Sequence, residues 1–141
     1  MTAEQKIIIE NNSNSEFSWP VRVYFEDTDA GGIVYHAQYL HFLERARTEW
    51  LRNLGFNQSE LKSQGILFVV RDMAIKWIDP ARLDDELIVN VNIEQIKKAS
   101  LIMQQVIMCG NISKLTARVT IACLDGVSMK PIAIPKNIFK A

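Results

Sequence analysis

The chain has 141 residues, enough for one ordinary domain, because chains of this size bury roughly two-thirds of the surface that they would expose when unfolded. Its sixteen basic and sixteen acidic side chains cancel, so no global field draws the protein onto nucleic acid or an anionic lipid surface. The longest apolar runs are short, and neither a signal peptide nor a membrane-spanning helix fits the N-terminal pattern. We therefore expect one globular domain with no nucleic-acid partner and no transmembrane segment.

The two cysteines, Cys109 and Cys123, each lie in an apolar segment with strand character. No second pair completes a zinc-type spacing, so the cysteines predict no metal site. We interpret them as reduced thiols in the core, which is typical of a cytoplasmic protein.

The first part of the chain predicts an arm, a strand and a turn. Residues 1–16 are polar and have no sustained period, which favours a flexible N-terminal arm before a single domain at 17–141. The aromatic and β-branched content of residues 17–26 predicts a strand, in which Pro20 fits only near the start or at a sheet edge. Residues 27–32 form the turn that ends this strand.

The segment 37–54 predicts the one long helix. Its apolar residues recur at spacings of three or four: Leu40, Leu43, Ala46, Trp50 and Leu54. Gly55 follows where a left-handed residue ends a helix, and residues 59–64 predict a short second helix closed by Gly65. Large apolar side chains in this region and the next strand are expected in the core rather than in a substrate pocket: Phe42, Trp50, Met73 and Trp77.

The rest of the chain predicts sheet. Four segments have strand character: 66–78, 87–94, 101–109 and 115–124. In the segment 87–94, apolar residues alternate with mostly polar ones, as in a strand with one buried face. Gly110-Asn111 between the last two is a hairpin signal. A strand, a long helix and about four antiparallel strands indicate an α+β domain.

Chemistry is expected where Glu26-Asp27-Thr28-Asp29-Ala30-Gly31-Gly32-Ile33-Val34-Tyr35-His36 leads into the long helix. This segment sets the carboxylate of Asp29 and the imidazole of His36 in a glycine-containing turn. The helix N-terminus behind them exposes backbone N–H groups and carries about half a positive charge, so it can hold an oxyanion or polarise a carbonyl group.

Each of these residues also has a structural interpretation. Aspartate side chains in a turn bind neighbouring backbone N–H groups, and a histidine before a helix often caps it or is partly buried. A calcium loop counted from Asp27 would need Asp or Asn where Gly31 stands and a bidentate Glu where Gln38 stands, so the calcium interpretation fails. The residues alone leave the turn and catalytic interpretations of Asp29 both open.

Taken together, these segments resemble the hotdog-fold thioesterases, and within them the Tol-Pal-associated acyl-CoA thioesterases (YbgC-like) and their 4-hydroxybenzoyl-CoA thioesterase relatives. The resemblance runs from about Val21 to Lys136. It rests on Tyr39 and on the segments 24–36, 44–47, 68–71, 80–85 and 129–131. It implies a hotdog fold, with an antiparallel sheet of about five or six strands wrapped around one long central helix. It also implies a homodimer joined through the sheet edges, with active sites at the interface, or a homotetramer of such dimers.

The resemblance also assigns roles within the motif. It implies that Asp29 is the catalytic carboxylate, as base or nucleophile, whereas Asp27 supports the turn. The backbone N–H of His36 would polarise the thioester carbonyl, a donor worth on the order of 3 kcal/mol where water is excluded. The His36 side chain marks the Tol-Pal-associated group and would position water, hold the thioester or assist proton transfer. The further residues expected to contact substrate here are Gly32, Tyr35 and Tyr39.

A second candidate region is the turn Lys97-Lys98-Ala99-Ser100. Basic residues in a turn are usually just solvated. The relatives bind the nucleotide phosphates of coenzyme A with a basic pair and a serine in the corresponding turn. The resemblance therefore implies that Lys97, Lys98 and Ser100 hold coenzyme A, and Arg82 is a further candidate.

The function that the resemblance implies is hydrolysis of acyl-coenzyme A to the free acid and coenzyme A, with no cofactor and no metal. The chain has no Gly-x-Ser-x-Gly nucleophile elbow, which argues against the α/β-hydrolase route to this reaction. Two alternatives stay open. One is a hotdog hydratase or dehydratase, and the other is a non-catalytic module of envelope assembly that binds acyl-CoA or an acyl carrier protein.

Overall fold

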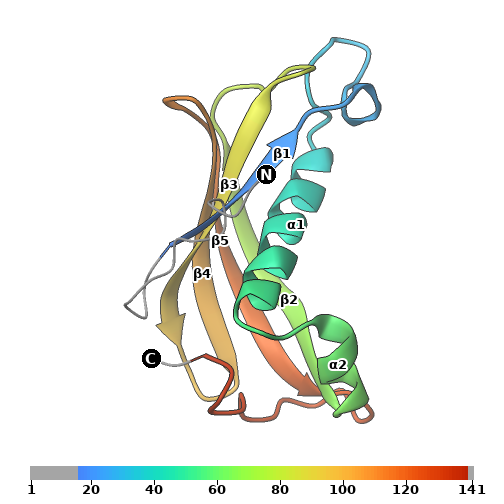
Figure 1. Ribbon diagram of the computed structural model, residues 1–141, viewed down its shortest axis with the longest axis vertical. Coiled ribbons are helices and arrows are strands. Elements are labelled where there is room, and N and C mark those ends of the chain that lie inside the picture. Colours follow the sequence, from blue (N-terminus) through green and yellow to red (C-terminus); the bar gives the residue numbers. More distant parts are fainter. Residues whose placement is uncertain (1–15, 140–141) are drawn as a thin grey trace.

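The computed structural model describes residues 16–139 (Figure 1). Five strands form one antiparallel sheet in the order β1-β3-β4-β5-β2. Their bounds are Phe17–Arg22 for β1, Ile66–Trp77 for β2, Glu86–Ile96 for β3, Ser100–Cys109 for β4 and Ile112–Asp125 for β5. The expected α+β hotdog fold is confirmed. The predicted N-terminal arm lies outside the described residues, apart from Glu16.

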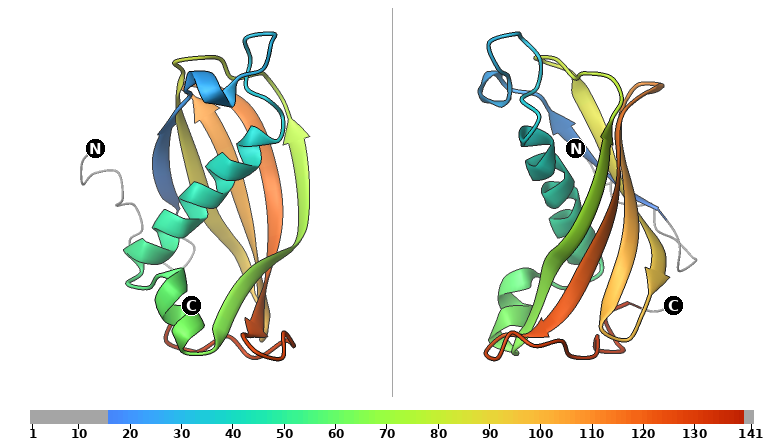
Figure 2. Two further views of the ribbon diagram at one scale, coloured as in Figure 1. Left: turned by 90° about the vertical axis from the view of Figure 1, so that its right-hand side faces the viewer. Right: turned by 180° about the vertical axis from the view of Figure 1, so that it is seen from behind.

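Figure 2 shows the long helix α1 (Gln38–Asn53) lying lengthwise against one face of the curved sheet, with the short helix α2 (Gln58–Ser63) at its lower end. Both helices lie where the sequence predicts them. Gly55 and Gly65 have φ angles of 98° and 83°, and these left-handed residues end the two helices as expected. Within residues 16–139, no helix combines the length and the apolar character needed to cross a bilayer.

The core lies between α1 and the sheet. The side chains that α1 buries are Tyr39, Phe42, Leu43, Ala46, Trp50 and Leu51. The core positions of Phe42 and Trp50 are thus confirmed, whereas Leu40, one of the periodic apolar residues, is 42% exposed. Successive helical residues are turned by about 100° about the helix axis. The buried face of α1 therefore leaves the side chain of Leu40 pointing toward solvent. Both cysteines are free, with Cys123 buried and Cys109 half-buried.

The first strand ends at Arg22 rather than at Glu26. The carboxylate of Asp27 accepts a 2.8 Å hydrogen bond from the Tyr24 N–H, and the Asp27 N–H donates to the Tyr24 carbonyl at 2.9 Å. These bonds wind the chain into a 3₁₀ turn, η2 (Phe25–Asp27), against the strand propensity of its aromatic residues. Pro20 lies on β1, an edge strand, as expected.

The strand β2 contains a bulge. Val70 pairs with Ile121 and Asp72 with Thr120, so Arg71 is the extra residue. An extra residue moves the following side chains to the other face of the strand. As a result Phe68 before the bulge and Met73 after it both pack against the core. Beyond them Trp77 is 49% exposed, so its predicted place in the core was wrong.

Candidate active site

The segment between η2 and α1 folds into a compact loop, residues 27–36, at one end of the molecule (Figure 1). The Asp29 N–H donates to the Ile33 carbonyl at 2.9 Å, and the Gly32 N–H donates to the Asp29 carbonyl at 3.0 Å. Gly32 has a φ of 82°, a conformation that side chains with a Cβ rarely adopt. This turn holds the loop just before the first residue of α1.

Asp27 supports this loop from inside. Its side chain is 3% exposed, and its second oxygen accepts a 2.8 Å hydrogen bond from the Gln38 side chain. Gln38 is the first residue of α1. With the bond from Tyr24, both carboxylate oxygens are occupied, so the predicted turn-supporting role of Asp27 is confirmed.

Asp29 points the other way, into solvent. One of its oxygens accepts a 2.8 Å hydrogen bond from the Gly31 N–H. The hydrogen bonds found within residues 16–139 include none to its second oxygen. Asp29 therefore makes a local turn and still has one carboxylate oxygen available to react.

His36 is also exposed and lies at the start of the helix. Its ring packs against Tyr35, with centroids 4.5 Å apart, and against the edge of Trp77 at 6.3 Å. Trp77, which the sequence predicts to lie in the core, thus forms a wall of the candidate site. No acceptor for the His36 N–H occurs among the described backbone and side-chain hydrogen bonds. The residue offers a free backbone donor beside α1.

Tyr39 lies beneath the loop rather than in it. The side chain is 3% exposed, and its hydroxyl accepts a 3.0 Å hydrogen bond from the Ala81 N–H. Burial raises the pKa of this phenol. The Ala81 carbonyl accepts a 2.9 Å bond from the Val34 N–H. Tyr39 therefore belongs to the core beneath the loop, and its contact with substrate stays a prediction.

A buried lysine for which the sequence predicts no role holds the same region. The ammonium group of Lys114 donates to the Asp79 carboxylate at 2.6 Å and to the Pro80 carbonyl at 3.0 Å. Its side chain is 8% exposed, whereas that of Asp79 is 47% exposed. Lys114 thereby anchors the segment 79–82, which in turn contacts the 27–36 loop. No local sequence pattern reveals this, because the partners are far apart along the chain.

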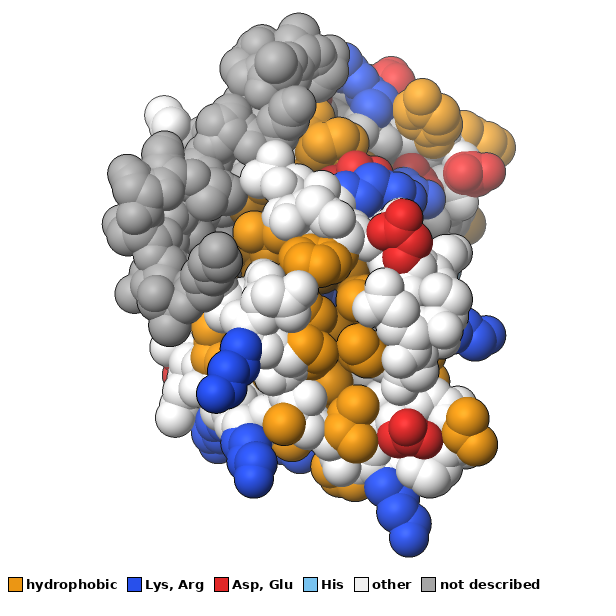
Figure 3. Space-filling view, turned by 60° about the horizontal axis from the view of Figure 1, so that its bottom comes forward, with side chains coloured by type: hydrophobic (Ala, Val, Ile, Leu, Met, Phe, Trp, Pro, Cys, Tyr) orange, Lys and Arg blue, Asp and Glu red, His pale blue; other side chains and the backbone are white. Residues whose placement is uncertain are grey.

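The second candidate region lies at the other end of the molecule. Lys97, Lys98 and Ser100 belong to the turn between β3 and β4, at the opposite end of the long axis from the 27–36 loop (Figure 1). The Lys97 N–H closes this turn on the Ser100 carbonyl at 2.8 Å. Both lysines are exposed, and Ser100 is buried. Figure 3, where this end comes forward, shows Lys and Arg side chains standing around hydrophobic ones. One subunit does not bring the two candidate regions together.

Arg82 lies with the first region instead. It forms an isolated β-bridge to Ile33, and its backbone N–H donates to the Asp85 carboxylate at 2.9 Å. For metal binding, the part of the chain from 16 to 139 contains no group of three or more His, Cys, Asp or Glu side chains.

Comparison with known proteins identifies the family. Residues 23–141 match the thioesterase-like superfamily. The chain belongs to this superfamily. The present chain is 50% identical over 123 residues to the acyl-CoA thioesterase YbgC of Haemophilus influenzae, and the match covers 86% of the present chain and 90% of the relative. It is 33% identical over 129 residues to the YbgC acyl-CoA thioesterase of Helicobacter pylori, with 84% and 93% covered.

A solved structure shows the same relationship. The crystal structure of a probable thioesterase from Bartonella henselae matches the thioesterase-like chain with a TM-score of 0.81 at 40% identity, covering 85% of this chain and 99% of that one. The expectation of a hotdog-fold thioester hydrolase is therefore confirmed.

Proposed function

We propose that the protein hydrolyses acyl-coenzyme A thioesters to the free acid and coenzyme A. The observation that carries this proposal is the pairing, on one loop, of a carboxylate oxygen of Asp29 and a backbone N–H of His36 that lack partners within residues 16–139. Thioester hydrolysis requires an electrophilic carbonyl and an activated nucleophile. The names of the YbgC relatives add the acyl-CoA substrate class.

In the proposed reaction the thioester carbonyl oxygen accepts a hydrogen bond from the His36 N–H. The start of α1 contributes its partial positive charge, which stabilises the negative charge that develops on that oxygen. Gly32 lets the substrate approach the backbone closely, because it has no side chain. The rings of Tyr35, His36 and Trp77 form one wall against which the acyl-thioester lies.

Asp29 supplies the nucleophile in one of two ways. As a general base, its free oxygen takes a proton from a water whose oxygen attacks the carbonyl carbon. As a nucleophile, that oxygen attacks the carbon itself, and water then cleaves the mixed anhydride. In both routes the carbon–sulfur bond breaks with its electron pair on sulfur, and the coenzyme A thiolate then takes a proton. Both routes need the carboxylate ionised.

We further propose that Lys97, Lys98 and Ser100 hold coenzyme A in a site shared by two subunits. The turn that carries them lies far from the 27–36 loop of the same subunit. The outer edge of β2 is unpaired within residues 16–139, and Val70, Trp77 and Ile78 near it are 44%, 49% and 50% exposed. Antiparallel pairing of β2 with its copy about a two-fold axis would bring opposite ends of two subunits together. Tetramer formation, an acyl carrier protein partner and a cytoplasmic location remain predictions.

The experiment that tests the proposed activity measures thiol release from acyl-CoA esters of several chain lengths. We expect Asp29→Asn to lose at least about 100-fold in kcat/KM, because a positioned base contributes that much, while its thermal unfolding stays unchanged. Glu26→Gln, an exposed acid on the same segment, is the matched control and should keep full activity. Near-normal kcat/KM in Asp29→Asn would sink the assignment. An enoyl absorbance change without thiol would favour a hydratase, and binding without turnover would favour a non-catalytic module.

The shared site has its own test. Lys97→Ala/Lys98→Ala should raise KM for acyl-CoA but not for an acyl-pantetheine ester, which lacks the nucleotide. Mixing this variant with Asp29→Asn under subunit exchange should restore activity, because each heterodimer then contains one intact site in which Asp29 and the two lysines come from different chains. No restoration despite exchange would place both regions of a site in one subunit.

A further inference from the structure

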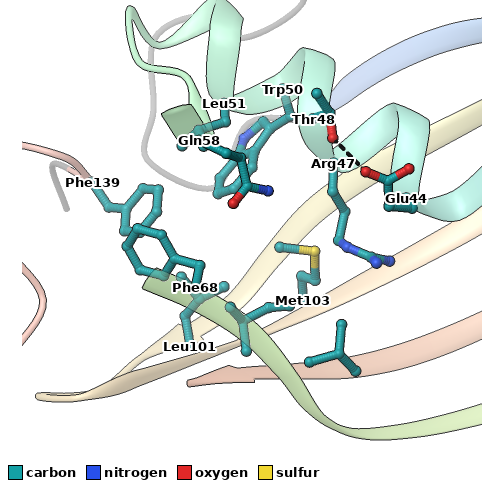
Figure 4. A pocket seen from close by; sticks show the side chains of 12 residues that line it. Glu44, Arg47, Thr48, Trp50, Leu51, Gln58, Phe68, Leu101, Met103 and Phe139 are labelled. Atoms are coloured by element: carbon teal, nitrogen blue, oxygen red, sulfur yellow. Dashed lines mark hydrogen bonds between the residues drawn. The ribbon is translucent and has the colours of Figure 1, made fainter. Parts of the chain in front are cut away.

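A cavity of about 170 Å³ lies beneath the second half of α1, and no residue of the 27–36 loop lines it. Figure 4 shows its walls: α1, the start of α2, the strands of the sheet and Phe139. Most of the lining is apolar, with Trp50, Phe68 and Phe139 providing aromatic surface. A dry cavity of roughly 150 Å³ accommodates benzene, so this cavity suits a compact group of about six non-hydrogen atoms.

Two charged side chains line this largely apolar space, Glu44 and Arg47. Figure 4 shows Arg47 extending from α1 toward the sheet. Its guanidinium donates a 3.0 Å hydrogen bond to the side-chain oxygen of Gln105. Gln105 is fully buried, and its amide nitrogen donates to the Leu43 carbonyl at 3.1 Å and the Asn90 carbonyl at 3.2 Å. The buried amide therefore fixes where the guanidinium lies.

Arg47 forms no salt bridge with the described residues, although the carboxylate of Glu44 lies close enough to favour its charged form. Within residues 16–139, no Asp or Glu oxygen lies within salt-bridge distance of it. The neighbouring acid, Glu44, accepts a 2.9 Å bond from the Thr48 hydroxyl instead. Burial lowers the pKa of the Arg47 guanidinium. A partly buried guanidinium with donors to spare favours a ligand oxygen.

The proposed dimer connects this cavity to the reacting thioester. Phe68 and Val70 line the cavity and lie in the first half of β2, whereas Trp77, beside His36, ends the same strand. When β2 pairs antiparallel with its copy, the first half of one strand lies beside the end of the other. An acyl group bound at His36 of one subunit would then point toward the cavity of its partner.

We propose that this cavity receives the acyl group and that Arg47 makes the enzyme selective for compact acyl groups with an oxygen acceptor at the end distant from the thioester. This inference rests on the proposed function. A plain alkyl group would displace water from the guanidinium and leave its N–H groups unpaired, which is costly in an apolar site. A terminal hydroxyl or carboxylate on the acyl group would accept a hydrogen bond from those N–H groups.

Three substrates of matched length test the proposal: hexanoyl-CoA, 6-hydroxyhexanoyl-CoA and the mono-CoA thioester of hexanedioic acid. The wild-type enzyme should hydrolyse at least one of the two oxygenated esters with a kcat/KM about 10-fold or more above that of hexanoyl-CoA. Arg47→Met should abolish this preference by lowering kcat/KM for the oxygenated ester alone. Comparison of the two oxygenated esters distinguishes a preference for a neutral acceptor from a preference for a charged one.

Arg45→Met is the matched control, since Arg45 is an exposed arginine on the same helix, and it should leave the preference unchanged. Arg47→Lys, which keeps the charge with fewer donors, should give an intermediate ratio and covers the case in which Arg47→Met does not fold. A wild-type preference for hexanoyl-CoA, or an unchanged ratio in a folded Arg47→Met, would overturn the inference. Thiol release from none of the esters would instead contradict the proposed function itself.

Discussion

The hydroxyl of Tyr39 accepts a hydrogen bond of 3.0 Å from the backbone N–H of Ala81. This bond joins the first turn of α1 to the segment after β2, and the Ala81 carbonyl continues the connection to Val34 at 2.9 Å. Residue 81 is therefore a bridge between the helix and the loop that carries Asp29 and His36. Residues outside that loop set its position.

Tyr39→Phe tests this bridge. The substitution keeps the ring but leaves the N–H of Ala81, which is fully buried, without an acceptor. We expect the free energy of unfolding to fall by about 1–3 kcal/mol and kcat to fall with little change in KM. Denaturant unfolding and steady-state kinetics measure the two effects. Tyr24→Phe, at a tyrosine that is 62% exposed, is the control, and equal stability of the two variants would contradict the prediction.

The ion pair of Lys114 and Asp79 predicts an order of stabilities. Asp79→Ala leaves the ammonium group of Lys114 buried without its carboxylate, whereas Lys114→Met leaves behind an aspartate that is 47% exposed. An unpaired buried charge costs more than a solvated one. We therefore expect Asp79→Ala to lower the unfolding temperature more than Lys114→Met does. The reverse order would show that the pair does not hold the segment 79–82 in this way.

The two aspartates of the motif should separate stability from activity. Asp27→Ala removes the acceptor of the Tyr24 N–H and of the Gln38 side chain. We expect a loss of about 1–3 kcal/mol in unfolding free energy. Asp29→Ala changes an exposed residue and should stay within about 0.5 kcal/mol of the wild type. Chemical denaturation of both variants at neutral pH measures the difference, and a larger loss in Asp29→Ala would reverse the two roles.

Asp125 predicts a pH-dependent contribution to stability. Its carboxylate accepts hydrogen bonds from the N–H groups of Ser128 at 2.7 Å and Val127 at 3.0 Å, and these bonds lower its pKa in the folded state. Because the pKa is lower in the folded state, the ionised carboxylate stabilises the fold at pH values above the ordinary carboxyl pKa. That contribution is lost as the pH falls through the folded-state pKa. The unfolding temperature of Asp125→Asn should therefore lie below the wild type at pH 7 and approach it at about pH 3. A difference of the same size at both pH values would contradict this.

Local patterns predicted the main elements because their causes are local. The spacing of apolar residues and a glycine after the last turn predicted α1, and period-2 alternation predicted β3 with Leu87 and Val89 buried. The hairpin at Gly110, with a φ of 60°, followed from its own two residues. The motif that holds Asp29 and His36 is likewise contiguous, so its place before the helix was readable from the chain.

Other predictions failed where a specific hydrogen bond or the place of a strand in the sheet overrides residue preference. Strand propensity extended the first strand to Glu26, but the hydrogen bonds of Asp27 turned the chain at Tyr24. The apolar character of Trp77 predicted a place in the core, but the residue ends the edge strand β2 and lies half exposed beside His36. Local spacing does not encode which strand lies at the edge of the sheet.

By itself, the sequence determined the α+β class, the long helix, the hairpin at Gly110 and the loop that joins Asp29 to His36, because these features depend on neighbours within a few residues. Only the tertiary structure decided that Lys114 anchors the segment behind that loop, that Arg47 reaches a cavity through Gln105, and that Lys97 and Lys98 lie at the opposite end of the subunit. Those relationships depend on strand order and register, which bring together residues far apart in the chain or keep them apart.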